Sequence, residues 1–258
     1  MTTFTAIFRN MIRKTLQLIG DYMLLMKRVF QKPERWRIFG KQLILEADKL
    51  VIQSIPLIAL ISVFIGGVIV MQTALNLVSP FIPKMYVGYM ARESLILEFC
   101  STMVCLILAG KIGSNISSEI GSMRITEQID AMEMMGVNSA NYLILPKVVA
   151  ATLLNPFLML MSFFLGLVGG WFIVYTTGII QVSDYLAGLQ YWFLGHYVTY
   201  SIIKTAVFSF IITTVASFYG YNAKGGSLGV GRSSTQAIVA SSALILIFNL
   251  ILTQLLLR

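Results

Sequence analysis

The sequence predicts an all-α polytopic membrane protein, in which an amphipathic N-terminal interfacial helix precedes five transmembrane helices. Of its 258 residues, 57% are hydrophobic and only 12% are charged, and the mean hydropathy is +0.81. A soluble domain of this length cannot bury so much apolar surface. A spanning helix needs about 20 mainly apolar residues to cross about 30 Å of hydrocarbon. The stretches that meet this requirement lie near 51–77, 86–110, 145–177, 197–219 and 234–257.

The first 50 residues precede these spans and are expected to lie on the membrane surface. Through residues 1–30, apolar side chains recur at helical spacing, whereas basic ones such as Arg9, Arg13 and Arg28 mostly occupy the other side. This pattern indicates an interfacial helix, followed by an elbow that leads into a single transmembrane domain over residues 51–258. A helix packed on that domain, with a solvated basic face, is the alternative.

The basic residues also predict the orientation of the chain. Residues 1–49 contain ten of the nineteen lysines and arginines, and the segment from Gln181 to His196 contains none. Because short basic segments stay in the cytoplasm, the N-terminus is expected to be cytoplasmic. Topology and anionic lipid then explain the net charge of +8, and no nucleic-acid partner is needed. The segments 111–144 and 220–233 would lie inside, and the loops 78–85 and 178–196 and the C-terminus outside.

The second span is unusual because it carries Arg92, Glu93 and Glu98. An ionised group at the centre of a spanning helix costs about 2.5–3.5 kcal/mol on insertion scales. These three side chains are therefore expected to face protein or a water-filled cavity.

Several familiar sites are excluded. Cys100 and Cys105 are too few and wrongly spaced for a zinc site, and His196 is the only histidine, so no metal site or histidine-based triad is expected. The glycine-rich run 225–234 lacks the Gly-Lys-Ser/Thr ending of a phosphate loop and is expected to form a tight turn into the last helix. Any use of ATP must therefore depend on a partner.

The segment EIGSMRITEQIDAMEMMG, residues 119–136, concentrates charge between the second and third spans. On a helical wheel Ile125, Ile129 and Met132 share one face, and carboxylates occupy the adjoining arc. We expect a short amphipathic helix whose acidic flank anionic head groups would repel, so a protein partner explains it better than a membrane surface. A solvated helix that only connects two spans is the alternative.

Two runs carry a resemblance to a known family. The patterns A-G-[RK]-x-G, E-[IL]-G-x-M, E-Q-[IL]-D-A-[ML]-x-x-[ML]-G and P-[RK] follow in that order within residues 106–150, and GYNAKGGSLGVGRSSTQAIVASS occupies 220–242. The chain resembles the MlaE/YrbE permease family of lipid-transporting ABC systems. Its length, its amphipathic N-terminus and its five expected spans fit that family over the whole chain.

The resemblance implies that the segment near 117–136 is a coupling helix that docks in a groove of an ATPase subunit. Its charged residues would transmit ATP-driven closure of the ATPases to the membrane helices. These residues are Glu119, Arg124, Glu127, Asp130 and Glu133.

The resemblance also implies partners and a cargo. A permease homodimer would work with two ATPase subunits, which bind ATP and Mg, and with MCE-domain proteins on the outer face of a bacterial inner membrane. The chain itself would be no enzyme, and would move phospholipid between the inner and outer membranes through a pocket between the two copies. Arg92, Glu93 and Glu98 would line the lipid path or pair with Lys204 of the fourth span. The alternative is an internal ion pair that only fixes helix packing.

One departure and two alternatives remain. The family reads R-E-[LF]-G-P where this chain has RESLILEF, residues 92–99, and the loss of Gly and Pro is expected to remove a helix irregularity near residues 96–97. A membrane scaffold that recruits a cytoplasmic partner without transport is one alternative. A lipid-directed intramembrane enzyme that uses Glu93 or Glu98 as acid or base is the other. The transport direction, the lipid species and the identity of the MCE and ATPase partners are left open.

Pairs of small residues four apart permit close helix approach in two of the spans. Gly166 and Gly170 form one such pair, and Ser62 and Gly66 form the other. Contact between two copies and packing within one chain explain them equally well.

Overall fold

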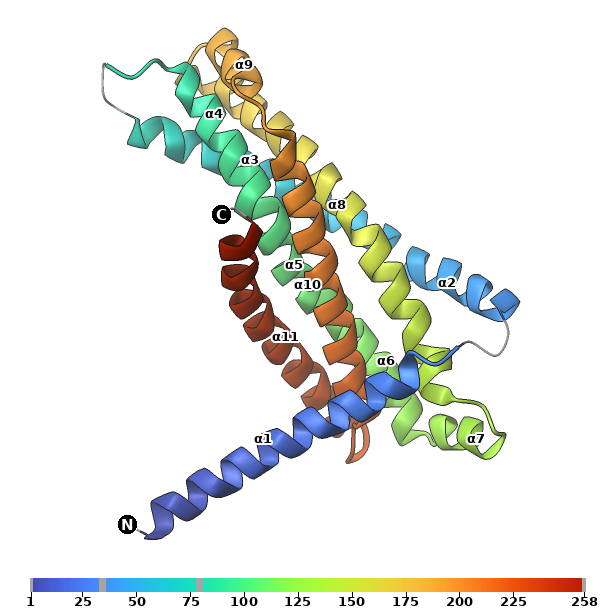
Figure 1. Ribbon diagram of the computed structural model, residues 1–258. Coiled ribbons are helices and arrows are strands. Elements are labelled where there is room, and N and C mark those ends of the chain that lie inside the picture. Colours follow the sequence, from blue (N-terminus) through green and yellow to red (C-terminus); the bar gives the residue numbers. More distant parts are fainter. Residues whose placement is uncertain (1, 33–35, 78–80, 257–258) are drawn as a thin grey trace.

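The structure, a computed structural model, describes residues 2–32, 36–77 and 81–256, without the side chains of residues 2–12, 14 and 15. These residues form helices and no strand (Figure 1). The long helices are α1 (Thr2–Val29), α2 (Trp36–Leu50), α3 (Ile55–Asn76), α8 (Ser139–Thr177), α10 (Gly195–Tyr221) and α11 (Gly226–Leu256). The shorter ones are η1 (Ile52–Ser54), α4 (Met85–Ser94), η2 (Leu95–Met103), α5 (Val104–Leu108), η3 (Ala109–Gly113), α6 (Ser114–Ile125), α7 (Gln128–Met134) and α9 (Val182–Gln190).

Five continuous helical stretches are long and apolar enough to cross a membrane, as the sequence predicted. They are longer than the predicted spans, because hydropathy detects only the apolar part of a helix. The helical backbone continues through the more polar residues on either side. The elbow, for example, joins the first span as one helical stretch. The five stretches are Trp36–Asn76, Met85–Ile125, Ser139–Thr177, Gly195–Tyr221 and Gly226–Leu256.

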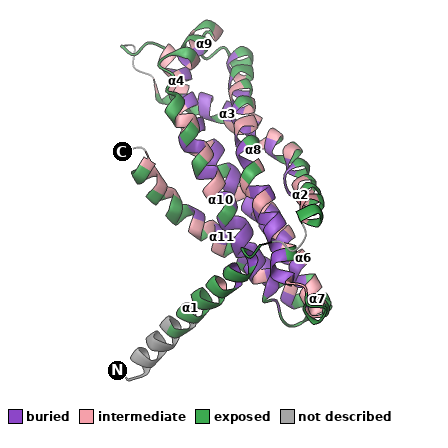
Figure 2. Ribbon diagram, turned by 45° about the vertical axis from the view of Figure 1, so that its right-hand side comes forward, coloured by how far each residue is buried: buried purple, intermediate pink, exposed green. Residues whose placement is uncertain are grey.

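Helix α10 is the centre of the bundle. It packs against α8, α11, α6 and η2. The most apolar part of α10 is 72% buried, whereas the corresponding part of α11 is only 11% buried. Figure 2 shows the buried residues gathered in the middle of the bundle, whereas α1 and much of α11 are exposed. Helix α11 therefore offers a long surface that the described part of the chain does not cover.

Helices α3 and α8 approach each other closely enough for backbone contact. A Cβ atom placed on Gly66 would lie 1.9 Å from the carbonyl oxygen of Gly166, and one on Gly169 would lie 2.0 Å from that of Val63. The hydroxyl of Ser62 donates to that of Ser162 at 2.7 Å across the same contact. Packing within one chain thus accounts for the small residues of both helices.

The second span contains two π-helical segments, η2 and η3. The expectation that the loss of Gly and Pro near residues 96–97 would leave a regular helix is wrong. Side chains of α10 supply a reason: Ser201 donates to the carbonyl of Ile96, and Lys204 donates to that of Leu97. Helix irregularities of this kind are frequent at functional sites.

The bundle has two different ends (Figure 1). The α7 end carries α6, α7, the turn between α10 and α11 and the base of α1, which projects away from the bundle. The α9 end carries α4, α9 and the segment 191–194. The predicted glycine turn is shorter than expected, because only Gly225 and Gly226 have positive φ, 92° and 72°, and the rest of the run lies in α11.

Candidate functional site

The segment 119–136 is two helices, so the single amphipathic helix that we expected is wrong. Helix α6 ends at Ile125, and Glu127 adopts a left-handed conformation with φ of 59° before α7 begins at Gln128. The hydroxyl of Thr126 donates to the carbonyl of Ser122 at the end of α6. The break turns α7 away from the axis of α6, so the carboxylates do not form one continuous flank.

Glu119 lies in a network of buried and half-buried charges. Its carboxylate accepts hydrogen bonds from Lys49 at 2.7 Å and from Lys147 at 3.0 Å, and Lys147 also donates to Glu46 at 2.6 Å. Lys147 is buried, and the second carboxylate oxygen of Glu46 is buried and has no hydrogen-bond partner among the residues that the structure describes. We call these four residues the Lys147 network. It ties α2, α6 and α8 together, so Glu119 faces the bundle instead of a docking partner.

Glu133 joins α7 to the bundle. Its carboxylate accepts hydrogen bonds from Tyr221 at 2.8 Å and from Ser139 at 3.0 Å, and it lies 3.7 Å from the guanidinium of Arg28. The hydrogen bond from Tyr221, more than any other contact, lowers the pKa of Glu133, although partial burial opposes this. Because the folded-state pKa is depressed, this anchor stabilises the fold above the ordinary glutamate pKa and is lost as pH falls through the depressed value.

The rest of the charged segment is open to solvent. Arg124 and Asp130 pair at 2.5 Å with both side chains partly exposed, and Glu127, Met134 and Met135 are exposed. Methionine side chains adapt to irregular partner surfaces. The surface of α7 that a partner could reach therefore combines these two methionines with carboxylates.

A second polar cluster lies inside the bundle, where α10 meets η2. The ammonium of Lys204 donates to the carbonyl of Leu97 at 3.1 Å, to Glu98 at 2.9 Å and to the hydroxyl of Tyr200 at 2.9 Å. All three of its N–H groups are thus used, and its side chain is completely buried. Lys204 neutralises Glu98 from the protein side.

Glu98 also contacts α11. Its second oxygen accepts from Thr102 at 3.0 Å and from the amide of Asn249 at 3.2 Å, and Thr253 lies 3.5 Å from the first oxygen. The side chain of Glu98 is nevertheless 42% exposed. We call the six residues Glu98, Thr102, Tyr200, Lys204, Asn249 and Thr253 the Glu98 cluster.

Arg92 and Glu93 are not joined to Lys204. The Nε of Arg92 donates to Glu93, and its terminal nitrogens donate to Glu93 and to the carbonyls of Leu189, Tyr191 and Trp192. All five guanidinium N–H groups are used, and Arg92 is buried. Arg92 therefore holds the segment that follows α9 and has no free donor for a ligand. Of the four residues expected on a lipid path, the structure brings together Glu98 and Lys204.

Sequence reasoning gave Lys204 as a possible partner of Glu98, but it missed the partners of Lys147 and the contact of Asn249 with Glu98. Lys147 was a visible signal, because it is a single lysine directly after Pro146 at the start of a long apolar run, and Asn249 is likewise a single amide within an apolar run. Burial of such residues requires partners, but the sequence alone does not identify them.

Comparison with known proteins places this arrangement in a family. The sequence model described as Permease MlaE matches residues 43–255. A probable ABC transporter permease protein of Rickettsia bellii is 35% identical over 202 residues, 78% of each chain. The intermembrane phospholipid transport system permease protein MlaE of Haemophilus influenzae is 29% identical over 203 residues, 78% of this chain and 77% of that protein. The chloroplastic protein TRIGALACTOSYLDIACYLGLYCEROL 1 of Arabidopsis thaliana is 32% identical over 161 residues, 61% of this chain and 45% of that protein.

Proposed function

This chain belongs to the MlaE permease family, and from that premise we propose that it is the permease subunit of an ABC transporter that moves phospholipids between the inner and outer membranes. Its partners would be an ATPase subunit, which binds ATP and Mg, and an MCE-domain protein. The α7 end would face the cytoplasm and the α9 end the MCE protein. The chain would supply the path through the membrane, and the ATPase subunit would hydrolyse ATP.

The Glu98 cluster carries the proposal. A phospholipid needs an apolar environment for its acyl chains and polar groups for its head group. The Glu98 cluster offers a partly exposed carboxylate, an amide and hydroxyls at the junction of η2, α10 and α11, on an otherwise apolar bundle. Because Lys204 is enclosed behind Glu98, a lipid would first meet Glu98, Asn249 and the threonines.

A homodimer fits the exposed surface of α11. Leu246, Leu250 and Leu255 are exposed there, and the Glu98 cluster reaches this surface through Asn249. A second copy packed on α11 would enclose the partly exposed Glu98 in a pocket between the two chains.

Helix α7 is the surface that we assign to the ATPase. Its exposed methionines and carboxylates suit a helix-in-groove contact with a basic rim. Glu133 and Tyr221 link α7 to α10, and α6 continues the same helical stretch that contains Glu98. Movement of α7 would therefore shift the population of the dimer between states with an open and a closed lipid pocket.

The deciding experiment measures lipid movement directly. The chain and its ATPase subunit are reconstituted in donor vesicles that contain a fluorescent phospholipid, and acceptor vesicles carry the MCE-domain partner. We expect transfer of the fluorescent lipid that depends on ATP. Stable ATPase binding with no lipid movement would instead identify a membrane scaffold, and turnover of lipid by the isolated chain would identify an enzyme.

Charge reversal at α7 tests the coupling surface. We expect Glu127→Lys combined with Asp130→Lys to weaken ATPase association about tenfold or more, as loss of contacts at the centre of an interface does, and to uncouple transport while membrane insertion is unchanged. Asp48→Lys combined with Asp184→Lys changes the net charge equally, away from α7, and should bind the ATPase normally. Equal ATPase binding by both double variants would refute the coupling assignment.

Glu98→Gln tests the lipid path. The glutamine keeps the size and most hydrogen bonds of Glu98 but leaves the Lys204 charge without its carboxylate. We expect less co-purified phospholipid and slower transfer, because a neutral amide accepts hydrogen bonds from the ammonium or hydroxyl groups of a head group more weakly than a carboxylate does. ATPase association should be unchanged. Glu93→Gln is the matched control, because Glu93 pairs with Arg92 and does not contact the Glu98 cluster. Equal effects of the two substitutions on bound lipid would contradict a head-group role for Glu98.

A further inference from the structure

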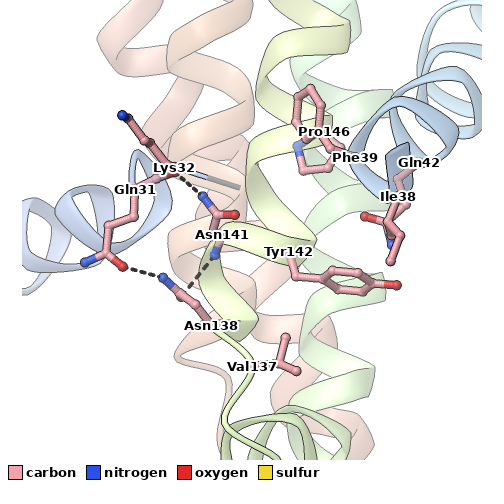
Figure 3. A pocket seen from close by; sticks show the side chains of 10 residues that line it. All are labelled: Gln31, Lys32, Ile38, Phe39, Gln42, Val137, Asn138, Asn141, Tyr142 and Pro146. Carbon is pink, nitrogen blue, oxygen red and sulfur yellow. Dashed lines mark hydrogen bonds between the residues drawn. The ribbon is translucent and has the colours of Figure 1, made fainter. Parts of the chain in front are cut away.

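A cavity of about 340 Å³ lies beside the end of α1, and none of its lining residues belongs to the Lys147 network or the Glu98 cluster. Figure 3 shows the side chains that line it. Gln31 and Lys32 line it from the segment after α1, Ile38 and Gln42 line it from α2, and Tyr142 lines it from α8. Its volume falls within the range of about 300–1,000 Å³ that small-molecule sites occupy. The cavity is therefore large enough to hold a polar ligand group.

Two asparagines at the start of α8 hold one wall of the cavity in place. The amide of Asn141 donates to the carbonyls of Val29 at 2.7 Å and Gln31 at 2.6 Å, and that of Asn138 donates to the carbonyl of Arg28 at 3.1 Å. The carbonyls of Arg28 and Val29 belong to the end of α1, where the helix has no further donors of its own, and that of Gln31 lies just after it. The asparagines thus bind the end of α1 to α8, and this wall does not depend on a ligand.

The surroundings of the cavity are basic. An adjoining hollow is lined by Arg37, Ile38, Lys41, Gln42, Leu45 and Tyr142. Ile38, Gln42 and Tyr142 line both spaces, and Lys32 lines the cavity alone. The described residues that line the two spaces include three cations and no carboxylate. Glu46, one turn along α2, is directed to Lys147. A ligand held here should be an anion.

Helix α2, which lines both spaces, also carries exposed apolar side chains. Trp36, Ile44 and Leu45 of α2 are exposed, and α2 leads directly into the apolar helix α3. Cations beside exposed apolar side chains, on a helix that enters the membrane, are typical of the head-group level of a bilayer. A soluble anion would use only the cations, whereas a lipid would use both kinds of surface.

We propose that the cavity and the adjoining hollow bind the head group of an anionic phospholipid from the leaflet at the α7 end. Its phosphate lies among Lys32, Arg37 and Lys41, the hydroxyl of Tyr142 donates to it, and its acyl chains follow the exposed apolar side chains of α2. Such a lipid bridges α1, α2 and α8 at the side of the bundle, at a site separate from the Glu98 cluster. Its binding does not require transport, so it is tested independently of the proposed function.

Native mass spectrometry of the full chain, released from phosphatidylcholine vesicles that contain phosphatidylglycerol, measures the retained lipid. We expect phosphatidylglycerol to be retained in preference to phosphatidylcholine. The triple variant Lys32→Gln, Arg37→Gln and Lys41→Gln should retain about tenfold less, because it removes the three cations that line the two spaces and would surround the phosphate. The control triple Lys27→Gln, Lys224→Gln and Arg232→Gln removes the same charge at the same end and should behave as the unchanged chain.

Photolabelling of the unchanged chain gives a second readout that does not depend on the folding of a variant. Phosphatidylglycerol with a photoreactive head group should label the peptide that contains Tyr142. Equal retention by the two triple variants, or equal retention of both lipids, would overturn the proposal. So would labelling that soluble glycerol phosphate abolishes, because the site would then hold a soluble anion.

Discussion

Lys147→Met is expected to destabilise the protein more than any other removal of a single charge at the α7 end. Lys147 is 1% exposed and neutralises both Glu46 and Glu119. Its loss leaves Glu46 without a cationic partner and with a second oxygen that is already unpaired. Removal of one partner of a buried ion pair costs about 3–5 kcal/mol, and the lower end applies here because Glu119 keeps Lys49. The unfolding midpoint in mild detergent should fall accordingly.

Two further variants separate lost charge neutralisation from lost packing. Lys224→Met removes an exposed lysine at the same end of the bundle and should change the midpoint little. In the Lys147→Met background, Glu46→Gln should restore part of the stability, because it removes the unpaired buried charge. The network assignment is wrong if Lys147→Met is no more harmful than Lys224→Met, or if Glu46→Gln makes it worse.

The long helices could be predicted from the sequence because their cause is local. About 20 mainly apolar residues in succession predict a span wherever they occur, and each of the five observed stretches contains a segment of this kind. The second span was predicted despite Arg92, Glu93 and Glu98, since these groups were expected to face protein or a water-filled cavity. The partners of these groups were only half predicted. Glu98 pairs with Lys204, which was one of the expected outcomes, whereas Arg92 donates to backbone carbonyls within residues 189–192, which was not expected.

The remaining features depend on contacts between distant segments. Glu119 meets Lys49 and Lys147 only because α2, α6 and α8 converge. The spacing of residues in the sequence does not indicate that these three helices meet. The break at Glu127 could not be predicted from a helical wheel, because the wheel does not show that a non-glycine residue adopts a positive φ. The π-helical η2 could not be predicted from the absence of Gly and Pro. Its carbonyls accept from Ser201 and Lys204, which are about a hundred residues away.

Gly169→Ala should prevent the native packing of α3 on α8. The added Cβ would lie 2.0 Å from the carbonyl oxygen of Val63 and less than 3 Å from two further backbone atoms of that residue. No side chain can rotate away, so the helices must separate, and the contacts of Ser62 with Ser162 and of Gly66 with Gly166 are lost with them. Overpacking of a core costs about 1–3 kcal/mol, occasionally more, and we expect the upper end or beyond. The unfolding midpoint and the yield of folded protein in detergent measure the effect.

The sign of the change makes this prediction specific. In a helix interior, alanine is ordinarily more stable than glycine by about 0.5–1 kcal/mol. Gly231 of α11 has nothing within 4 Å of an added Cβ, so Gly231→Ala should leave stability unchanged or raise it. Opposite signs at the two positions would establish that direct backbone contact joins α3 to α8 within one chain. A neutral or stabilising Gly169→Ala would mean that the two helices lie farther apart, and the small residues would then be free to serve contact between two copies.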